Sequence, residues 1–131
     1  MFHCSITYNY PVREIAIPVA ISCTICPDKI KNCKGIVDTG ATASMISGRI
    51  AKQLDLVPNG TVTVSGVHGS TLTNTYLADV SFGNYTFLNL PVSEADDNAG
   101  FDFLIGMDIL GMGNFYFSTT SSGHVFRLFL W

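Results

Sequence analysis

The stretch GIVDTGATASMIS, residues 35–47, holds a single carboxylate between an apolar run and the start of a helix. Its first residues, 35–37, predict a strand, and Asp38 stands where that strand ends. Ser47 has the side chain of a helix N-cap and predicts a short helix over residues 48–56. The pattern therefore predicts that Asp38 is held on a tight turn between a strand and a helix.

The length and composition predict one all-β domain over residues 1–131. A chain of this length builds one hydrophobic core and is short for two lobes with a cleft between them. Hydrophobic residues make up 47% of it and charged residues 13%, which argues against disorder. β-Branched and aromatic residues recur in short runs broken by glycine, asparagine and proline, which is typical of strands and turns.

The charge pattern argues against nucleic acid as a partner. Seven basic and ten acidic residues give a net charge of −3, and no segment clusters lysine or arginine with aromatic residues. No segment reaches the roughly eighteen consecutive apolar residues of a membrane span, and no basic segment precedes a long apolar core at the N-terminus. The sequence therefore predicts no membrane partner and a cytoplasmic location, alone or as a domain of a larger precursor.

Alternating apolar and polar residues, interrupted by turn residues, predict a series of strands. The predicted strands cover residues 15–23, 35–37, 61–65, 71–82, 85–92, 101–105, 114–117 and 124–131. Residues 26–32 and 93–100 are predicted to be polar connections because turn-forming and charged residues dominate them. The glycines of residues 66–69 predict the tip of a long hairpin.

Three features follow one another along the chain. They are Asp38-Thr39-Gly40 after a strand, the glycine-containing hairpin tip, and Leu104-Ile105-Gly106 before a short helix. In this order and at this spacing they resemble the retropepsin-like aspartic proteases. The resemblance extends from about residue 15 to the end of the chain, and it implies a closed β-barrel with a flap hairpin and one or two short helices.

The resemblance implies an aspartic endopeptidase that works as a homodimer. Members of this family need two facing carboxylates and obtain the second from a partner chain, so one Asp38 per chain implies two chains per site. Two carboxylates within hydrogen-bonding reach do not both ionise comfortably, so the pair holds one proton. One can then act as base on water while the other acts as acid toward the scissile carbonyl oxygen. The family implies no metal and no organic cofactor, and a polypeptide substrate in extended conformation.

The resemblance also gives roles to residues around Asp38. Thr39 would hydrogen-bond across the dimer axis, Gly40 allows backbone N–H groups to approach the carboxylate, and Ala41 leaves space for water and substrate. The flap that closes over the substrate would have Gly66, Val67, His68 and Gly69 at its tip. Leu104, Ile105 and Gly106 would support the turn from below.

Two other carboxylates lie close to the third feature. Asp108 is interpreted as the N-cap of a short helical turn, and Asp102 as a residue at a strand edge or in an ion pair. Neither replaces Asp38 as the catalytic candidate.

The sequence departs from the viral members of the family in two places. Met107 stands where many viral members have arginine, so the ion pair of that arginine is absent. The chain also continues through a hairpin over residues 114–131, as in cellular and bacterial members. This hairpin is predicted to be either the dimer sheet or an extra layer over the core.

The same residues allow other interpretations. The Asp38 turn and the hairpin tip are compatible with a non-catalytic dimerisation or peptide-binding module of the same fold. Four cysteines could hold zinc, form a redox pair or remain ordinary thiols: Cys4, Cys23, Cys26 and Cys33. Because there is one C-x2-C pair and no second pair at finger spacing, ordinary reduced thiols and no metal are the expectation.

Overall fold

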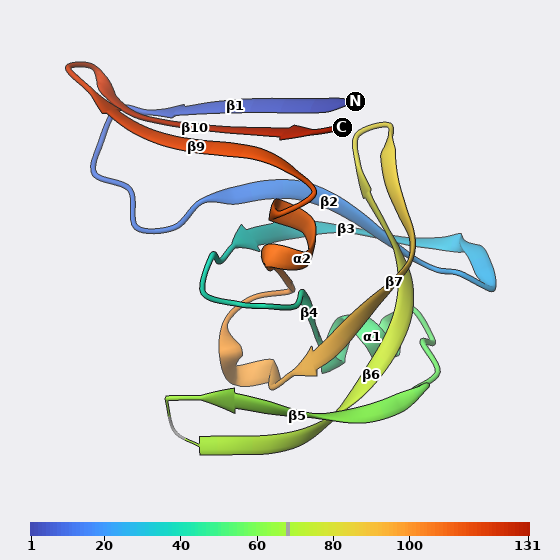
Figure 1. The fold of residues 1–131 in the computed structure, drawn as a ribbon. Coiled ribbons are helices and arrows are strands. Elements are labelled where there is room, and N and C mark those ends of the chain that lie inside the picture. Colours follow the sequence, from blue (N-terminus) through green and yellow to red (C-terminus); the bar gives the residue numbers. More distant parts are fainter. Residues whose placement is uncertain (68) are drawn as a thin grey trace.

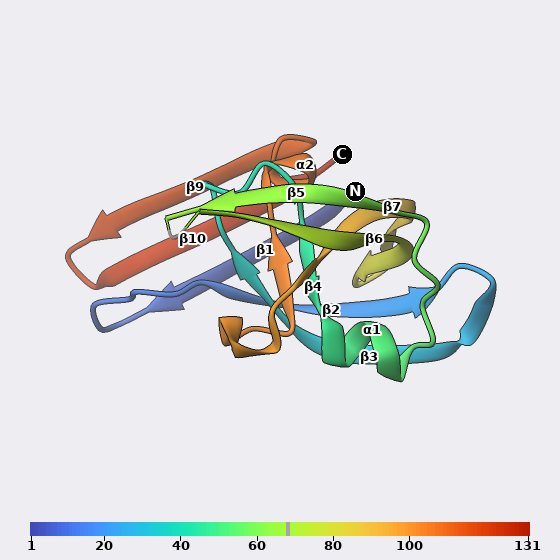
Figure 2. The same cartoon turned by 90° about the horizontal axis from the view of Figure 1, so that it is seen from below.

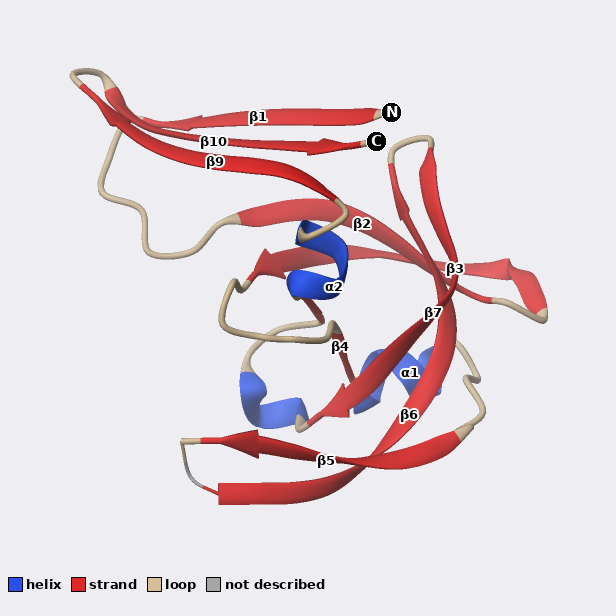
Figure 3. Cartoon of the chain, in the orientation of Figure 1, coloured by secondary structure: helices blue, strands red, loops and turns tan. Residues whose placement is uncertain are grey.

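The structure, a computed structural model, describes residues 1–67 and 69–131. Strands make up most of this part of the chain, accompanied by short helices, which confirms the all-β prediction (Figure 3). The strands form a seven-stranded and a three-stranded sheet.

The larger sheet has the strand order β2-β3-β8-β4-β7-β6-β5, and β2 also pairs with β6 (Figure 1). Its strands are β2 (Ala16–Cys23), β3 (Cys26–Val37), β4 (Met45–Ser47), β5 (Gly60–Gly66), β6 (Gly69–Phe82), β7 (Tyr85–Ala95) and β8 (Phe103–Ile105). Because β2 has β3 on one side and β6 on the other, the hydrogen-bonded strands return to their start. β5 lies outside this ring and forms the predicted long hairpin with the first half of β6.

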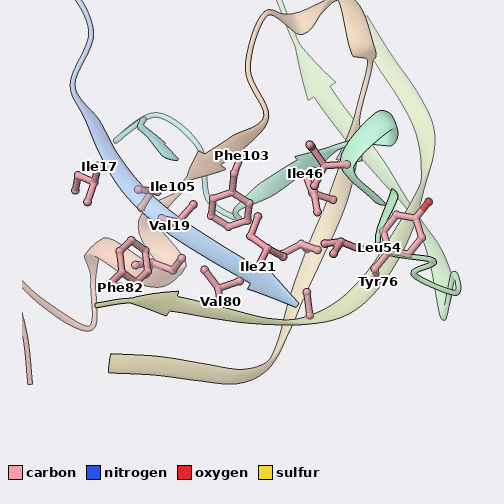
Figure 4. Close-up of a cluster of buried hydrophobic side chains, with 14 of the residues drawn as sticks. Ile17, Val19, Ile21, Ile46, Leu54, Tyr76, Val80, Phe82, Phe103 and Ile105 are labelled. Atoms are coloured by element: carbon pink, nitrogen blue, oxygen red, sulfur yellow. The ribbon is translucent and has the colours of Figure 1, made fainter. Parts of the chain in front are cut away.

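The hydrophobic core lies inside this ring of strands (Figure 4). Side chains along β2 alternate between the core and the outside, so Ile17, Val19 and Ile21 are buried. They pack in one cluster with Phe103 and Ile105 of β8. Each fully buried side chain of this size contributes about 1.5–3 kcal/mol relative to exposure. These core contacts stabilise the position of β8, and with it the position of the residues that are hydrogen-bonded to β8.

The helices are short. α1 (Gly48–Gln53) begins as predicted after Ser47, whose Oγ accepts the N–H of Ile50 (3.2 Å). It ends earlier than predicted because Asp55 has φ +53°, a left-handed conformation that stops a helix. The other α-helix is α2 (Met107–Leu110). Neither helix in the described part of the chain has the length and apolar character needed to cross a membrane.

The second sheet is formed by the two ends of the chain. Its order is β1-β10-β9, with β1 (Phe2–Tyr8), β9 (Gly113–Thr120) and β10 (Gly123–Leu130) all antiparallel (Figures 1 and 2). Phe126, Leu128 and Leu130 of β10 are buried in the common core. The predicted terminal hairpin is thus present and covers the core, joined by a strand, β1, that the sequence pattern did not predict.

Two predicted connections were wrong. Residues 26–32 belong to β3, because they pair with the end of β2 in a hairpin whose turn is only residues 24–25. The predicted loop 93–100 begins as strand: β7 runs to Ala95 and pairs in parallel with β4, and a 3-10 helix over Asp97–Ala99 follows. In both places polar and charged residues that belong to a strand were interpreted as loop.

Candidate active site

Asp38 lies on a turn that is anchored to β8. Val37, the last residue of β3, pairs with Ile105, and the Asp38 N–H donates to the Ile105 carbonyl oxygen (2.9 Å). The side chain bends back over the turn, so that its Oδ1 accepts the N–H of Gly40 (2.9 Å). The residue is half-buried, and the carboxylate therefore combines a fixed backbone with access to solvent.

Gly106 allows the Leu104-Ile105-Gly106 triplet to lie directly against the Asp38 turn. A Cβ at this position would lie 2.7 Å from the carbonyl carbon of Ala43 and 3.0 Å from the carbonyl oxygen of Ala41. Both contacts are to backbone, so only glycine permits the approach. The next residue, Met107, donates its N–H to the same Ala41 oxygen (2.8 Å). The predicted triplet and the Asp38 turn are therefore in direct contact.

Asp108 has a different place from the one predicted. It lies inside α2, whose N-cap is Gly106, so the prediction of a helix N-cap was wrong. Its carboxylate instead accepts the Oγ–H of Ser44 (2.7 Å) and the N–H of Ser44 (3.0 Å). The Ser44 oxygen in turn accepts the N–H of Gly106 (3.0 Å). Asp102 forms an ion pair with Arg49, one of the two roles expected for it.

A cleft of about 620 Å³ opens beside the turn, beneath β5. Asp38, Gly40 and Ala41 lie on one wall and Val62 and Val64 of β5 on another. Leu104 also lines the cleft, whereas Ile105 is fully buried beneath it. Thr39 is exposed at the turn and is not among the cleft-lining residues. The arrangement places a carboxylate at the wall of a cleft that is lined by apolar side chains and hydroxyl groups.

The predicted flap borders a second hollow, of about 790 Å³, that continues from the first through Met45, Val64 and Phe101. Gly66 and Gly69 pair with each other at the end of the β5–β6 hairpin, and both line this hollow together with Val67. His68, the remaining residue of the predicted tip, lies outside the described residues. The hairpin therefore borders two adjoining hollows, one of which is lined by Asp38.

The four cysteines are present as free thiols. Cys23 and Cys26 are register partners at the β2–β3 turn. Burial, assisted by the nearby Asp102 carboxylate, raises the pKa of the Cys33 thiol to about 11. Among the described residues, no group of three or more histidine, cysteine or acidic side chains is placed to hold a metal ion.

Most of the chain matches a known protein family. The sequence model of a family described as aspartyl protease matches residues 21–109, which include the Asp38 turn, the β5–β6 hairpin and the Leu104-Ile105-Gly106 triplet. The chain belongs to the aspartyl protease family. No curated protein matches it in a sequence search.

Solved structures place this aspartyl protease family member among the retropepsin-like folds. A retropepsin-like aspartic protease from Rickettsia conorii has a TM-score of 0.61 at 16% identity, and the match covers 97% of this chain and 91% of that one. EIAV protease in complex with the inhibitor HBY-793 has 0.59 at 19%, covering 81% and 92%. The retroviral protease-like domain of Ddi1 from Leishmania major has 0.55 at 17%, covering 88% and 94%. These likenesses confirm the predicted fold, including its similarity to bacterial and cellular members.

Proposed function

We propose that the chain is a homodimeric aspartic endopeptidase in which residues 1–131 form one domain and each subunit contributes one Asp38. The observation that carries this proposal is the position of Asp38, on a turn fixed to β8 and at the wall of the cleft under the flap hairpin. Thr39 and Gly40 complete the Asp-Thr-Gly turn, and no metal or organic cofactor takes part.

The chemistry follows from bringing two Asp38 carboxylates together. At about 4 Å and an effective dielectric constant near 20, two like charges repel by roughly 4 kcal/mol, so the pair retains one proton. The ionised carboxylate removes a proton from water, whose oxygen attacks the peptide carbonyl carbon, and the protonated carboxylate donates to the carbonyl oxygen. Collapse of the resulting diol breaks the C–N bond as the amine takes up a proton.

The cleft suits an extended polypeptide. Its lining includes Val62 and Val64 of β5 together with Met45 and Leu104. Apolar walls of this kind favour apolar side chains next to the bond that is cut. Gly66, Val67 and Gly69 would close over the bound peptide and exclude water from the reacting atoms.

The second copy is proposed to sit against β9. On one side β9 pairs with β10, and on its other side it has no strand partner among the described residues. Three adjacent aromatic residues on it, Phe115, Tyr116 and Phe117, are 36%, 53% and 49% exposed, and the strand carries no charged residue. An uncharged edge strand of this kind is a template for pairing with another chain. The β9–β10 turn and the flap end of β5 project to the same side of the molecule (Figures 1 and 2).

Dilution tests this proposal. Because dissociation divides the site between two chains, the specific activity on a mixture of apolar peptides is expected to fall as the protein is diluted, with cut sites read by mass spectrometry. Above the dimer dissociation constant the specific activity should be constant. Cleavage with a concentration-independent specific activity down to monomeric protein would contradict the homodimer. A folded dimer that cuts no peptide would instead support the non-catalytic binding module.

A further inference from the structure

Ser44 and the partly buried Asp108 connect the Asp38 segment to the start of α2. Ser44 is fully buried, and its N–H and Oγ–H both donate to the Asp108 carboxylate. The Ser44 oxygen accepts the Gly106 N–H. Neither residue lines the cleft, and in the described part of the chain Asp108 makes no ion pair. The negative charge of Asp108 is therefore met by N–H and O–H donors alone.

This connection holds the end of the segment that starts at Asp38. The beginning is fixed by the Asp38 N–H on Ile105, and Ala41 accepts the Met107 N–H. Residues 41–43, which lie between Asp38 and Ser44, line the cleft. Without the Asp108 carboxylate, two donors of the fully buried Ser44 would lose their acceptor, and buried donors rarely stay unpaired. The segment would have to move, and the cleft wall with it.

We propose that Ser44 and Asp108 are positioning residues, which set the place of residues 41–43 relative to Asp38 and so align a bound peptide with the catalytic carboxylates. This inference rests on the proposed function. Neither side chain needs to touch the substrate. A displacement of about 1 Å by a residue remote from the chemistry can lower the rate by roughly a hundredfold, so a connection of this kind has a large effect on turnover.

Three substitutions at Asp108 and a neighbouring carboxylate test the positioning role. Asp108→Ala removes both acceptors and is expected to lower kcat by about 10- to 100-fold, with a smaller change in KM. Asp108→Asn retains an oxygen for the Ser44 N–H, and its amide can donate to the Ser44 hydroxyl, so it should recover most of kcat. Asp102→Asn is the matched control, because Asp102 pairs with Arg49 outside the cleft, and it should behave as wild type.

A double-mutant cycle tests whether Ser44 and Asp108 act as one unit. Ser44→Ala should lower kcat, and the Ser44→Ala/Asp108→Ala variant should lose little more than Asp108→Ala alone, because both remove the same connection. Losses in kcat that multiply would overturn the inference, as would wild-type kcat in Asp108→Ala. If Asp108→Ala does not fold, Ser44→Ala should still lower kcat while Asp108→Asn does not, and wild-type kcat in Ser44→Ala would overturn the inference.

Amide hydrogen exchange separates this inference from the proposed function. The Ser44 and Gly106 amides should exchange faster in Asp108→Ala than in wild type and in Asp102→Asn, and unchanged protection would overturn the connection itself. If wild type cleaves peptides and Asp108→Ala cleaves equally well, the positioning role is wrong while the protease stands. If folded wild-type dimer cleaves nothing, the proposed function fails and the positioning role falls with it, even where exchange confirms the connection.

Discussion

Asp38→Asn is expected to lower kcat/KM for peptide cleavage by at least about a thousandfold. Each homodimer would lose both carboxylates, and with them the base that activates water and the acid that protonates the carbonyl oxygen; general acid–base groups contribute about 10²- to 10⁴-fold each. The fold should persist, because the asparagine oxygen can still accept the Gly40 N–H that Asp38 Oδ1 accepts in the wild type. The rate is measured on a peptide mixture with cut sites identified by mass spectrometry.

The control for this variant is Asp55→Asn. Asp55 forms an exposed ion pair with Lys29, remote from the cleft lining, so its loss should leave kcat/KM unchanged. Circular dichroism establishes that both variants are folded. Retained cleavage by folded Asp38→Asn, with the same cut sites as wild type, would show that another group performs the chemistry.

Gly106→Ala is expected to lower the free energy of unfolding by about 1–3 kcal/mol and to reduce peptide cleavage strongly. The new Cβ would be 2.7 Å from the Ala43 carbonyl carbon, and the contact is with backbone that has no rotamer to change. The Asp38 segment and α2 would have to separate, which breaks the Met107 to Ala41 hydrogen bond. Urea denaturation measures the stability, and the peptide assay measures the activity.

A glycine without such a contact provides the comparison. Gly66 has no atom within 4 Å of the position that a Cβ would occupy, so Gly66→Ala should change the stability by less than about 0.5 kcal/mol. Equal destabilisation by the two substitutions would mean that the close approach at Gly106 does not hold the turn.

The sequence predicted correctly the features that local chemistry determines. The Asp38 turn, the Ser47 cap and the glycine-tipped hairpin each depend on residues close together in the chain, and the structure contains all three. The Leu104-Ile105-Gly106 triplet was found through family resemblance, and the structure gives its physical reason in the close approach to Ala43.

Other elements depend on partners that are distant in the chain. β4 has only three residues and exists because β7 and β8 flank it, and β1 depends on pairing with β10. The Ser44–Asp108 pair spans 64 residues. A serine in a run of small residues and an aspartate at a helix start both have ordinary local explanations, so only the folded chain brings this pair together. The one available signal was a serine directly before the apolar residues with which β4 begins.

In the proposed enzyme, two copies of Asp38, one from each of two chains, form one catalytic site. The most direct test mixes wild type with Asp38→Asn at a fixed total concentration well above the dimer dissociation constant, and measures the initial rate of peptide cleavage after subunit exchange. Heterodimers hold one carboxylate and are inactive, so the rate should fall as the square of the wild-type fraction, to about one quarter in an equal mixture. A rate proportional to the wild-type fraction, about one half in the equal mixture, would show that each chain acts alone and would contradict the shared site.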